Sequence, residues 1–466
     1  MSTMERETIL DRITTYCRAA GMAETTFGRR AVNDGKLVGR IRDGRRISQQ
    51  TWTRIEQFMA AHPPAGRGER AVILPPRSAP PAQGAVPEPA ADDGAMGNFR
   101  FFDNRQKYLL FVNTCSEKWV VANRVALELA NIHPRPPAVR VFDAGVGDGT
   151  VLARLMRAMH SRFPTMPFHV VGKEISLEDV RLTLEKMPDR FFEHPATVLV
   201  LTNLYYAEAP WLTTRSAAAA SSFVWKEVAL SGNSSHAFER QITELQPFLA
   251  ENWQARIGKS GNPIYERPVA LVLYREDHRF LLDSVIPRRG GTAGDYDLIV
   301  ASQPYRARSP LAFKAAKVIG PLARALAPGG RLIGVHSHGH DPGMEIINRV
   351  WPDDAPFQHD RHQLLKAVKK ELAGDARHLN FNAYADSRSI FRYDMHTLPS
   401  EVSTSIGTST LFAAWNAAVY VAQIEDQRLE EATIDGRYID AARQVLQRHG
   451  GLWFNDESYV ISRRRD

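Results

Sequence analysis

The sequence predicts an α/β protein with a doubly wound, mostly parallel sheet, preceded by a small all-α domain. Three observations support this prediction. Strand-like apolar runs alternate with helical stretches from about residue 99 onward, which is typical of a parallel sheet covered on both faces. A glycine-rich turn follows the first of these strands. Short helical bursts, each broken by a turn residue, fill residues 8–62.

The chain is expected to divide into parts. Its 466 residues exceed the usual size of one hydrophobic core. Residues 1–62 form the helical domain, and the proline- and alanine-rich residues 63–98 predict a disordered linker. Residues 99–466 form the α/β domain, with insertions at 205–294 and 342–382. Such insertions are expected to shape a substrate pocket, because scaffolds hold sites while attached segments vary.

The elements of the α/β domain follow from its periodicity. The apolar run Val139–Phe142 predicts a buried first strand, and Thr150–His160 predicts the helix that follows it. Further strands are expected at Phe168–Gly172, Thr197–Leu201, Val269–Tyr274, Tyr296–Val300, Arg331–Val335, Ser389–Tyr393 and Ser458–Ser462. Further helices are expected at Leu177–Met187, Phe238–Trp253, Leu311–Leu326 and Thr408–Arg448.

The first strand runs into a turn with glycines at alternate positions: Gly145, Gly147 and Gly149. Small residues there let a ligand approach the backbone closely. About 25 residues later the second strand ends in Glu174, a carboxylate placed to bind ribose hydroxyls. Together these features indicate an adenosine ligand. The alternative is a structural turn with no ligand, since a lone glycine-rich turn is a weak signal.

An acidic residue followed by GxGxG, here Asp143 to Gly149, resembles the first motif of class I, Rossmann-like S-adenosylmethionine-dependent methyltransferases. Further matches follow in the family order, at Glu174, at Thr202-Asn203 and at the segment Leu326–Ile333. The resemblance implies the class I methyltransferase fold and S-adenosyl-L-methionine as cofactor.

The resemblance also implies roles for the residues of this turn and of the next strand ends. Asp143 and the backbone of Gly145, Gly147 and Gly149 would hold the methionine part of the cofactor, and Glu174 would hold the ribose. Asn203 and Leu204 would contact the adenine edge and face. An aspartate is commoner at the place of Asn203, and an asparagine after a strand also serves to cap a turn.

The expected strand Tyr296–Val300 leads into the segment Ser302-Gln303-Pro304-Tyr305. This segment is similar to the (Asn/Asp/Ser)-Pro-Pro-(Tyr/Phe) motif of methyltransferases that modify planar amino groups. The resemblance implies that Ser302 and the Gln303 carbonyl accept hydrogen bonds from the target nitrogen and that Tyr305 stacks on the acceptor. Gln303 replaces the first proline of the motif. The alternative is an ordinary loop in which Pro304 ends the strand.

Three smaller features remain. His336–Asp341 follows the expected strand Arg331–Val335 and offers imidazoles as metal ligands or as a general base; no second cluster of fixed spacing accompanies it, so no metal is expected. Tyr108 precedes the first strand and is either a lid over the cofactor or a core aromatic. Cys17 and Cys115 form no CxxC pair, which argues against a disulfide framework or a structural zinc site.

The N-terminal domain carries a local excess of basic residues. Seven lie between residues 29 and 46, against two acids: Arg29, Arg30, Lys36, Arg40, Arg42, Arg45 and Arg46 against Asp34 and Asp43. The segment from Leu37 to Ser48 resembles the recognition helix and exit of repressor-like helix-turn-helix domains. That resemblance implies contacts with duplex DNA, through Lys36, Arg40, Arg42, Arg45 and Arg46. The alternatives are a solvated face or a protein docking module.

The sequence therefore predicts an S-adenosylmethionine-dependent methyltransferase that acts on a nitrogen of a nucleic acid or on another amino or amide group. The alternative is a DNA-binding transcriptional regulator whose methyltransferase-like domain only senses the cofactor. A net charge of +7 agrees with an anionic partner, but only weakly at this length. Since no signal peptide and no run of about 18 apolar residues occurs, we expect a cytoplasmic protein with no membrane contact.

Overall fold

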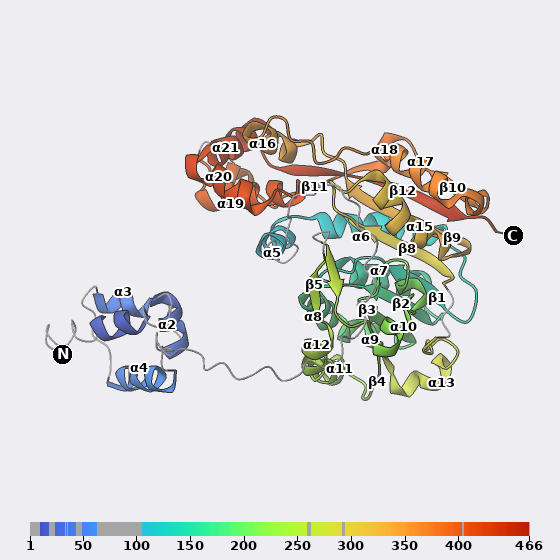
Figure 1. Cartoon of the computed structure of the whole chain (residues 1–466), viewed down its shortest axis with the longest axis horizontal. Helices are drawn as coiled ribbons and strands as arrows, with labels where there is room; N and C mark the ends of the chain where they lie inside the picture. Colours follow the sequence, from blue (N-terminus) through green and yellow to red (C-terminus); the bar gives the residue numbers. More distant parts are fainter. Residues whose placement is uncertain are drawn as a thin grey trace, which may run out of the picture. The chain divides into compact units, whose positions relative to one another are not determined.

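The computed structural model describes residues 10–17, 24–32, 34, 36–42, 49–62, 105–258, 262–290, 294–402 and 405–465. The chain divides into two compact units, Met1–Gln83 and Gly84–Asp466 (Figure 1). The boundary falls within the predicted linker, whose residues lie outside the described ones. None of the helices in the described part of the chain is long and apolar enough to cross a membrane.

The described residues of the N-terminal unit form helices and turns, as predicted. Its helices are residues 10–17, α2 (Glu24–Val32), α3 (Leu37–Arg42) and α4 (Gln49–Ala61). α2 packs against both α3 and α4. Their apolar faces close a small core, made of Ile13, Tyr16, Cys17, Phe27, Ala31, Leu37, Val38, Ile41 and Ile55.

Two arginines of the predicted DNA-binding surface form ion pairs with acidic side chains of the same unit. Arg40 forms an ion pair with Asp34, and Arg42 lies 3.0 Å from the carboxylate of Glu24. Lys36 is exposed. Arg45 and Arg46 lie outside the described residues. Binding of duplex DNA by these residues therefore stays a prediction, as does the helix-turn-helix resemblance.

The second unit is built on a ten-stranded sheet. Its centre is five parallel strands in the order β3-β2-β1-β8-β9. Their bounds are β1 Val139–Asp143, β2 Phe168–Lys173, β3 Thr197–Thr202, β8 Tyr296–Ser302 and β9 Leu326–Ser337. Because helices connect these strands and cover both faces of the sheet, the predicted doubly wound, mostly parallel fold is confirmed.

Beyond β9 the sheet continues with one antiparallel strand, and two short strands pair with the far edge of that strand. β12 (Trp453–Arg463) runs antiparallel to β9. β10 (Leu379–Asn382) and β11 (Ile390–Asp394) pair in succession along the other edge of β12. The short helix α18 (Asp386–Ser389) separates them.

Beyond β3 the first insertion lengthens the sheet. β7 (Val269–Arg275) pairs antiparallel with β3, and β4 (Val224–Leu230) pairs parallel with β7. The insertion of residues 205–294 therefore extends the sheet by two strands at the edge away from β8. The smaller elements of this insertion are η2 Ala209–Trp211, α10 Ala217–Ser222, α11 Ser235–Thr243, α12 Gln246–Asn252, β5 Ala255–Ile257, β6 Pro263–Tyr265, η3 Glu276–His278 and α13 Arg279–Leu282.

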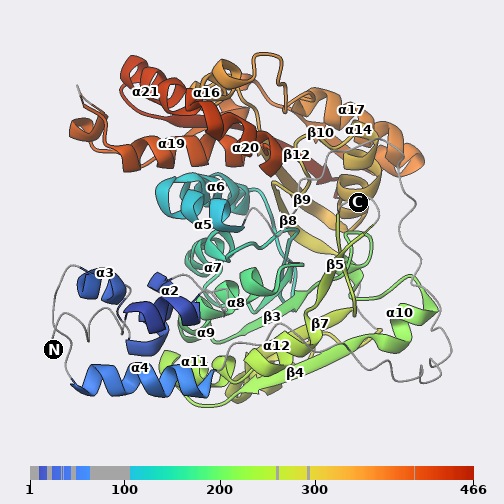
Figure 2. The ribbon, with the colours of Figure 1, turned by 60° about the vertical axis from the view of Figure 1, so that its left-hand side comes forward.

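Both faces of the sheet are buried, and the alternation of side chains along β1 decides what each face contacts. Val141 packs in one cluster with Leu152 and Leu155 of α7 (Thr150–Arg162), whereas Phe142 packs in the opposite cluster with Leu322. Figure 2 shows α6, α7 and α8 on one side of the strands and α14 and α17 on the other. The bounds of these and the neighbouring helices are α5 Arg105–Thr114, α6 Glu117–Ala126, η1 Leu127–Ala130, α8 Leu177–Glu185, α9 Pro188–Glu193, α14 Leu311–Phe313 and α17 Arg361–Leu372.

Three predicted helices differ in detail from the observed ones. The helix predicted at Phe238–Trp253 is two helices, α11 and α12. The stretch predicted from Leu311 to Leu326 continues from α14 into a π-helical turn, Lys314–Ile319, and α15, Gly320–Arg324. β9 then begins at Leu326, before the predicted strand, because the Pro-Gly-Gly segment is taken up as an irregularity in its pairing with β8.

The predicted C-terminal helix of 408–448 is three helices. They are α19 (Thr408–Val421), α20 (Asp426–Asp435) and α21 (Arg437–His449). The breaks occur where Gln423 and Gly436 take positive φ angles of 53° and 71°, which end a helix. With α16 (Pro342–Val350), these helices build a third apolar cluster. The remaining short helices are η5 Ala373–His378 and η6 Pro399–Val402.

Candidate active site

The strand order reverses between β1 and β8, so the sheet has a switch point there. Asp143 ends β1 and Ser302 ends β8. The two strand ends are adjacent, since the Ala144 amide donates to the Val300 carbonyl over 2.8 Å. In open α/β sheets, ligands bind in the crevice outside the carboxyl ends of the strands at such a point. The two motifs predicted for cofactor and acceptor thus meet at the place where this architecture binds ligands.

Two glycines hold the turn after β1, and a third leaves space beside it. Gly147 and Gly149 have φ angles of 55° and 79°, a region that other residues rarely adopt. A methyl group on Gly149 would also lie 2.8 Å from Cα of Thr183. A methyl group on Gly145 would meet nothing closer than the Ser302 carbonyl oxygen, at 3.9 Å. The fold itself therefore requires Gly147 and Gly149, whereas Gly145 leaves room for a ligand close to the backbone.

Glu174 is buried and fixed by backbone amides at the end of β2. Its Oε2 accepts a hydrogen bond from the Gly147 amide over 2.9 Å. Its Oε1 accepts from the amides of Ile175 and Ser176 over 2.7 and 2.9 Å. A carboxylate offers about four acceptor positions, so one remains for a ligand hydroxyl. Glu174 lies beside the glycine turn, as the sequence predicts.

Asp143 is fully buried next to the same turn. Its Oδ1 accepts a hydrogen bond from the Gly145 amide over 3.2 Å. Burial raises the pKa of Asp143 to about 7, and the nearby Glu174 adds to this rise. A cation bound next to Asp143 would favour the ionised carboxylate. This side chain can therefore recognise positive charge on a ligand.

Tyr108 of α5 covers the glycine turn. Its hydroxyl accepts a hydrogen bond from the Asp148 amide over 3.1 Å and lies 2.9 Å from the position of a methyl group on Gly147. Tyr108 therefore contacts the glycine turn, and its ring centre also lies 5.9 Å from that of Tyr420. Its role as a lid over the cofactor stays a prediction.

Lys118 of α6 also faces this region, and sequence reasoning missed it because no motif marks the helix. Its Nζ lies 5.6 Å from the centre of the Tyr108 ring and 3.3 Å from Oε2 of Glu117. Burial alone would lower the pKa of Lys118, but Glu117 and its other neighbours raise it well above the usual value. Lys118 is therefore a permanent cation beside the turn, suited to a carboxylate on a ligand.

Asn203 has a structural role at the end of β3. Its side-chain amide donates to the Arg267 carbonyl and accepts from the Val269 amide, both over 2.8 Å. These bonds tie β3 to the start of β7. Leu204, the next residue, is fully buried. The contact of Asn203 and Leu204 with adenine stays a prediction, and the geometry gives Asn203 a different task.

Gln303 holds the loop after β8 in an unusual conformation. Its φ angle is 47°, and its backbone amide donates to the Val335 carbonyl over 2.8 Å. Its side-chain amide donates to Ser337 over 3.2 Å and to the buried Asp456 over 3.3 Å. A proline has a φ near −65° and no N–H, so it fits neither feature. This explains why the first proline of the motif is absent here.

Tyr305 ends the same loop, and its hydroxyl is engaged inside the protein. The hydroxyl lies 2.7 Å from Nδ1 of His336 and 3.4 Å from the hydroxyl of Tyr459. His336 Nε2 lies 2.7 Å from Oε1 of Glu457. The sequence offers His336 as a metal ligand or a general base, but it gives no signal for Tyr305 as its partner. In the part of the chain that the structure describes, no group of three or more His, Cys, Asp or Glu side chains is placed to hold a metal ion.

Tyr206 connects the cofactor motif with the acceptor motif. Its hydroxyl donates to the Pro304 carbonyl over 2.6 Å, and Nζ of Lys173 lies 4.7 Å from the centre of its ring. Lys173 directly precedes Glu174 in β2. The start of the first insertion therefore contacts the predicted acceptor loop, residues 302–305.

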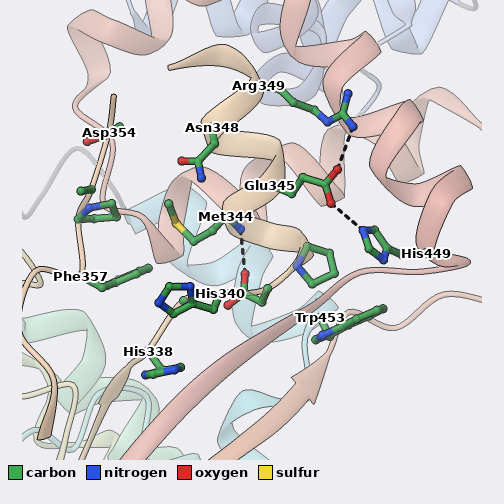
Figure 3. A pocket seen from close by; sticks show the side chains of 15 residues that line it. His338, His340, Met344, Glu345, Asn348, Arg349, Asp354, Phe357, His449 and Trp453 are labelled. Carbon is green, nitrogen blue, oxygen red and sulfur yellow. Dashed lines mark hydrogen bonds and ion pairs between the residues drawn. The ribbon is translucent and has the colours of Figure 1, made fainter. Parts of the chain in front are cut away.

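A separate pocket of about 730 Å³ opens at the carboxyl end of β9 (Figure 3). Its lining includes His338, His340, Met344, Phe357 and Trp453. Neither the glycine turn nor the loop of residues 302–305 contributes to this lining. Two residues of its lining contact the surroundings of Tyr305: His338, whose Nδ1 lies 3.6 Å from Oε2 of Glu457, and Asp354, which accepts from Arg308 over 2.7 Å.

No protein-family model and no curated protein matches this sequence. Among solved structures, the chain is similar to a geranyl diphosphate methyltransferase in complex with GPP and sinefungin, at 13% identity over 74% of this chain and 78% of that chain, with a TM-score of 0.28. It is also similar to a putative sarcosine dimethylglycine methyltransferase from Galdieria sulphuraria, at 10% identity over 75% and 85% of the two chains, with a TM-score of 0.28. A loganic acid methyltransferase with SAH shows 11% identity over 80% and 98% of the two chains and a TM-score of 0.29. These similarities are too distant to assign an activity, a cofactor or a substrate to this chain.

Proposed function

We propose that this protein is an S-adenosylmethionine-dependent methyltransferase whose acceptor is a nitrogen of a nucleic acid or of another amino or amide group. The observation that carries the proposal is the meeting of two motifs at the switch point of the sheet. The turn Asp143–Gly149 and the loop Ser302–Tyr305 end neighbouring strands there. A donor held by the first and an acceptor held by the second would lie side by side.

The residues around the glycine turn fit S-adenosylmethionine as a ligand. Gly145 leaves room at the backbone, Glu174 keeps an acceptor position for a ribose hydroxyl, and Asp143 favours a positive charge. Lys118 supplies a cation for the carboxylate of the methionine part. S-Adenosylmethionine supplies an activated methyl group on a sulfonium. The task of the protein is then mainly to align the acceptor, which contributes much of the rate in such reactions.

The experiment is calorimetry with S-adenosylmethionine and S-adenosylhomocysteine on the full-length protein, followed by transfer of a labelled methyl group. We expect both ligands to bind and Glu174→Ala to weaken binding by at least about tenfold, or 1.4 kcal/mol. Absence of binding to either ligand would refute the proposal. Binding without transfer to any DNA, RNA or protein fraction would favour a cofactor-sensing regulator instead.

A further inference from the structure

A chain of hydrogen bonds leads from Tyr305 into the interior of the protein. Its hydroxyl lies 2.7 Å from His336 Nδ1, and His336 Nε2 lies 2.7 Å from Glu457 Oε1. A carboxylate only accepts, so Nε2 carries the imidazole proton and Nδ1 is left to accept from the Tyr305 hydroxyl. All three side chains are at least nine-tenths buried.

Glu457 is held as an anion at the far end of this chain. It accepts from the backbone amide of Arg361 over 2.7 Å and from its guanidinium over 2.8 Å. Burial alone would raise the pKa of Glu457, but His336 and Arg361 lower it to about 2. A permanent negative charge therefore faces His336 and would stabilise its protonated form.

Other titratable groups also surround this chain. Tyr206, which follows β3, donates its hydroxyl to the Pro304 carbonyl next to Tyr305 over 2.6 Å, and Asp386 of α18 forms an ion pair with Arg361. Lys314 of the π-helical turn lies with Nζ 5.1 Å from the centre of the Tyr305 ring. Tyr459 of β12 lies 3.4 Å from the Tyr305 hydroxyl. His338, which follows β9, lies 3.6 Å from Glu457. The order of hydroxyl, imidazole and carboxylate is the arrangement in which an imidazole takes a proton from a hydroxyl and a carboxylate orients the imidazole.

We propose that Tyr305, His336 and Glu457 form a proton relay, and that the methyl acceptor is a nitrogen that loses a proton in the reaction rather than a carboxylate. This inference rests on the proposed function. The acceptor nitrogen forms a bond to the methyl carbon while the carbon–sulfur bond breaks and its electron pair stays on sulfur. The nitrogen gives its proton to the Tyr305 oxygen as Tyr305 passes its own to His336 Nδ1. The imidazolium remains paired with Glu457 and releases the proton to solvent after turnover.

The roles within the relay differ. Tyr305 contacts the acceptor and is the catalytic residue. His336 and Glu457 act through it and are positioning residues. The alternative is a purely structural role, in which the hydrogen bonds of Tyr305, His336 and Glu457 only fix the loop after β8. The two interpretations share the proton position on His336 and differ in two properties that an anchor does not require: the dependence of the rate on the Tyr305 hydroxyl and the dependence of the rate on pH.

The first test observes His336 directly by NMR of the full-length protein labelled with ¹⁵N-histidine and bound to S-adenosylhomocysteine, with His336→Asn to assign the signal. We expect a ring with its proton on Nε2 and with Nδ1 accepting from the Tyr305 hydroxyl, as the two 2.7 Å distances require. A proton on Nδ1 in the folded protein would overturn the relay.

The second test measures transfer of a labelled methyl group to two probes, an adenine-containing single-stranded oligonucleotide and a glutamine-containing peptide. Tyr305→Phe keeps the ring but removes the hydroxyl, and should lower the rate about a hundredfold with unchanged cofactor affinity. His336→Asn should also remove the decline in rate at low pH. The matched control is Tyr274→Phe, which removes a hydroxyl bonded to Glu227 over 2.5 Å in the distant strand β7, and should keep the wild-type rate.

The outcomes separate the relay from the proposed function. Full rate and an unchanged pH profile in a folded Tyr305→Phe protein would reject the relay while leaving the methyltransferase proposal standing. Loss of cofactor binding in the wild-type protein would reject the methyltransferase proposal, whatever the state of His336. If neither probe is methylated, a proton on Nδ1 of His336 in the first test still overturns the relay.

Discussion

The two halves of the carboxyl edge are built in different ways. We call the turn Asp143–Gly149 with Glu174 the cofactor half, and the loop Ser302–Tyr305 the acceptor half, after their proposed roles. In the cofactor half, Glu174 accepts hydrogen bonds from backbone amides of the turn and of the two residues that follow Glu174 itself. In the acceptor half, the Tyr305 hydroxyl contacts side chains of β9 and β12, and β12 lies about 150 residues away along the chain. The comparison teaches that a site made by one backbone turn leaves a motif in the sequence, whereas a site made by converging side chains does not.

The halves also differ in how much open space and how many unpaired polar groups they offer to a ligand. A methyl group on Gly145 would meet no atom within 3.9 Å, so the cofactor half is open to a ligand. In the acceptor half, the polar groups of Gln303 and Tyr305 already have partners inside the protein. Substitutions in the first half should therefore act on ligand binding, and those in the second half should act on turnover.

The largest effect is expected for Gly145→Val, which fills the open space of the cofactor half. Cofactor affinity should fall by at least about a hundredfold, or 2.7 kcal/mol, because the side chain occupies the ligand's place. The melting temperature should hardly change, since no protein atom lies within 3.9 Å of the added Cβ. Calorimetry with S-adenosylhomocysteine and thermal unfolding measure both. Wild-type affinity in this variant would place the ligand elsewhere.

The matched variant is Gly149→Ala in the same turn. Its φ of 79° and the 2.8 Å approach to Thr183 predict a loss of stability of about 1–3 kcal/mol. The pair thus separates a glycine that the ligand requires from one that the fold requires. If Gly149→Ala were as stable as the wild type, the left-handed turn would not exist as described.

The next effect tests the acceptor half. Gln303→Pro restores the proline of the family motif, but proline fits neither the φ of 47° nor the hydrogen bond to Val335. Methyl transfer should fall about a hundredfold through misplacement of Ser302 and Tyr305, while cofactor affinity stays within about twofold. Steady-state kinetics and calorimetry separate the two. A variant that gains activity would show that the motif resemblance outweighs the observed loop geometry. Gln303→Gly tolerates the φ angle and serves as the control.

A smaller effect is the pH dependence of cofactor binding through Asp143. Its pKa of about 7 means that the side chain is neutral below pH 7 and must lose a proton to pair with a cationic ligand. Affinity for S-adenosylmethionine should therefore weaken as pH falls below about 7, by up to tenfold per pH unit, and Asp143→Asn should remove this slope. Burial also raises the pKa of Asp179 to about 7, so Asp179→Asn is the control and should keep the slope. Calorimetry at several pH values measures it.

The smallest effect on binding is expected for Asn203→Ala, next to the cofactor half. The variant leaves the Arg267 carbonyl and the Val269 amide without their partner, so stability should fall by about 1–3 kcal/mol. Cofactor affinity should stay within about threefold of the wild type, because both ends of the amide serve the backbone. Denaturant unfolding and calorimetry give the two numbers. A tenfold loss of affinity would restore the adenine contact that the family resemblance implies.

Much of the fold and of the cofactor half was predictable from short windows of sequence. The apolar run Val139–Phe142, the alternate glycines and the position of Glu174 are local patterns, and the observed β1, its turn and the end of β2 agree with them. The spacing of apolar residues and the residue types in the turns decide such elements within about ten residues. The break at Gly436 has the same local origin and was missed because the apolar periodicity continues across it.

The sequence by itself determined the alternation of strands and helices, the glycine turn and the place of the acceptor loop at a strand end. Only the tertiary structure decided that the first insertion lengthens the sheet beyond β3, that Gln303 bonds to Asp456, and that Tyr305 meets His336 and Glu457. The physical reason is that these pairings join segments tens to hundreds of residues apart. Their choice depends on which apolar faces and buried polar groups must satisfy one another once the chain is compact, and no local pattern records that choice.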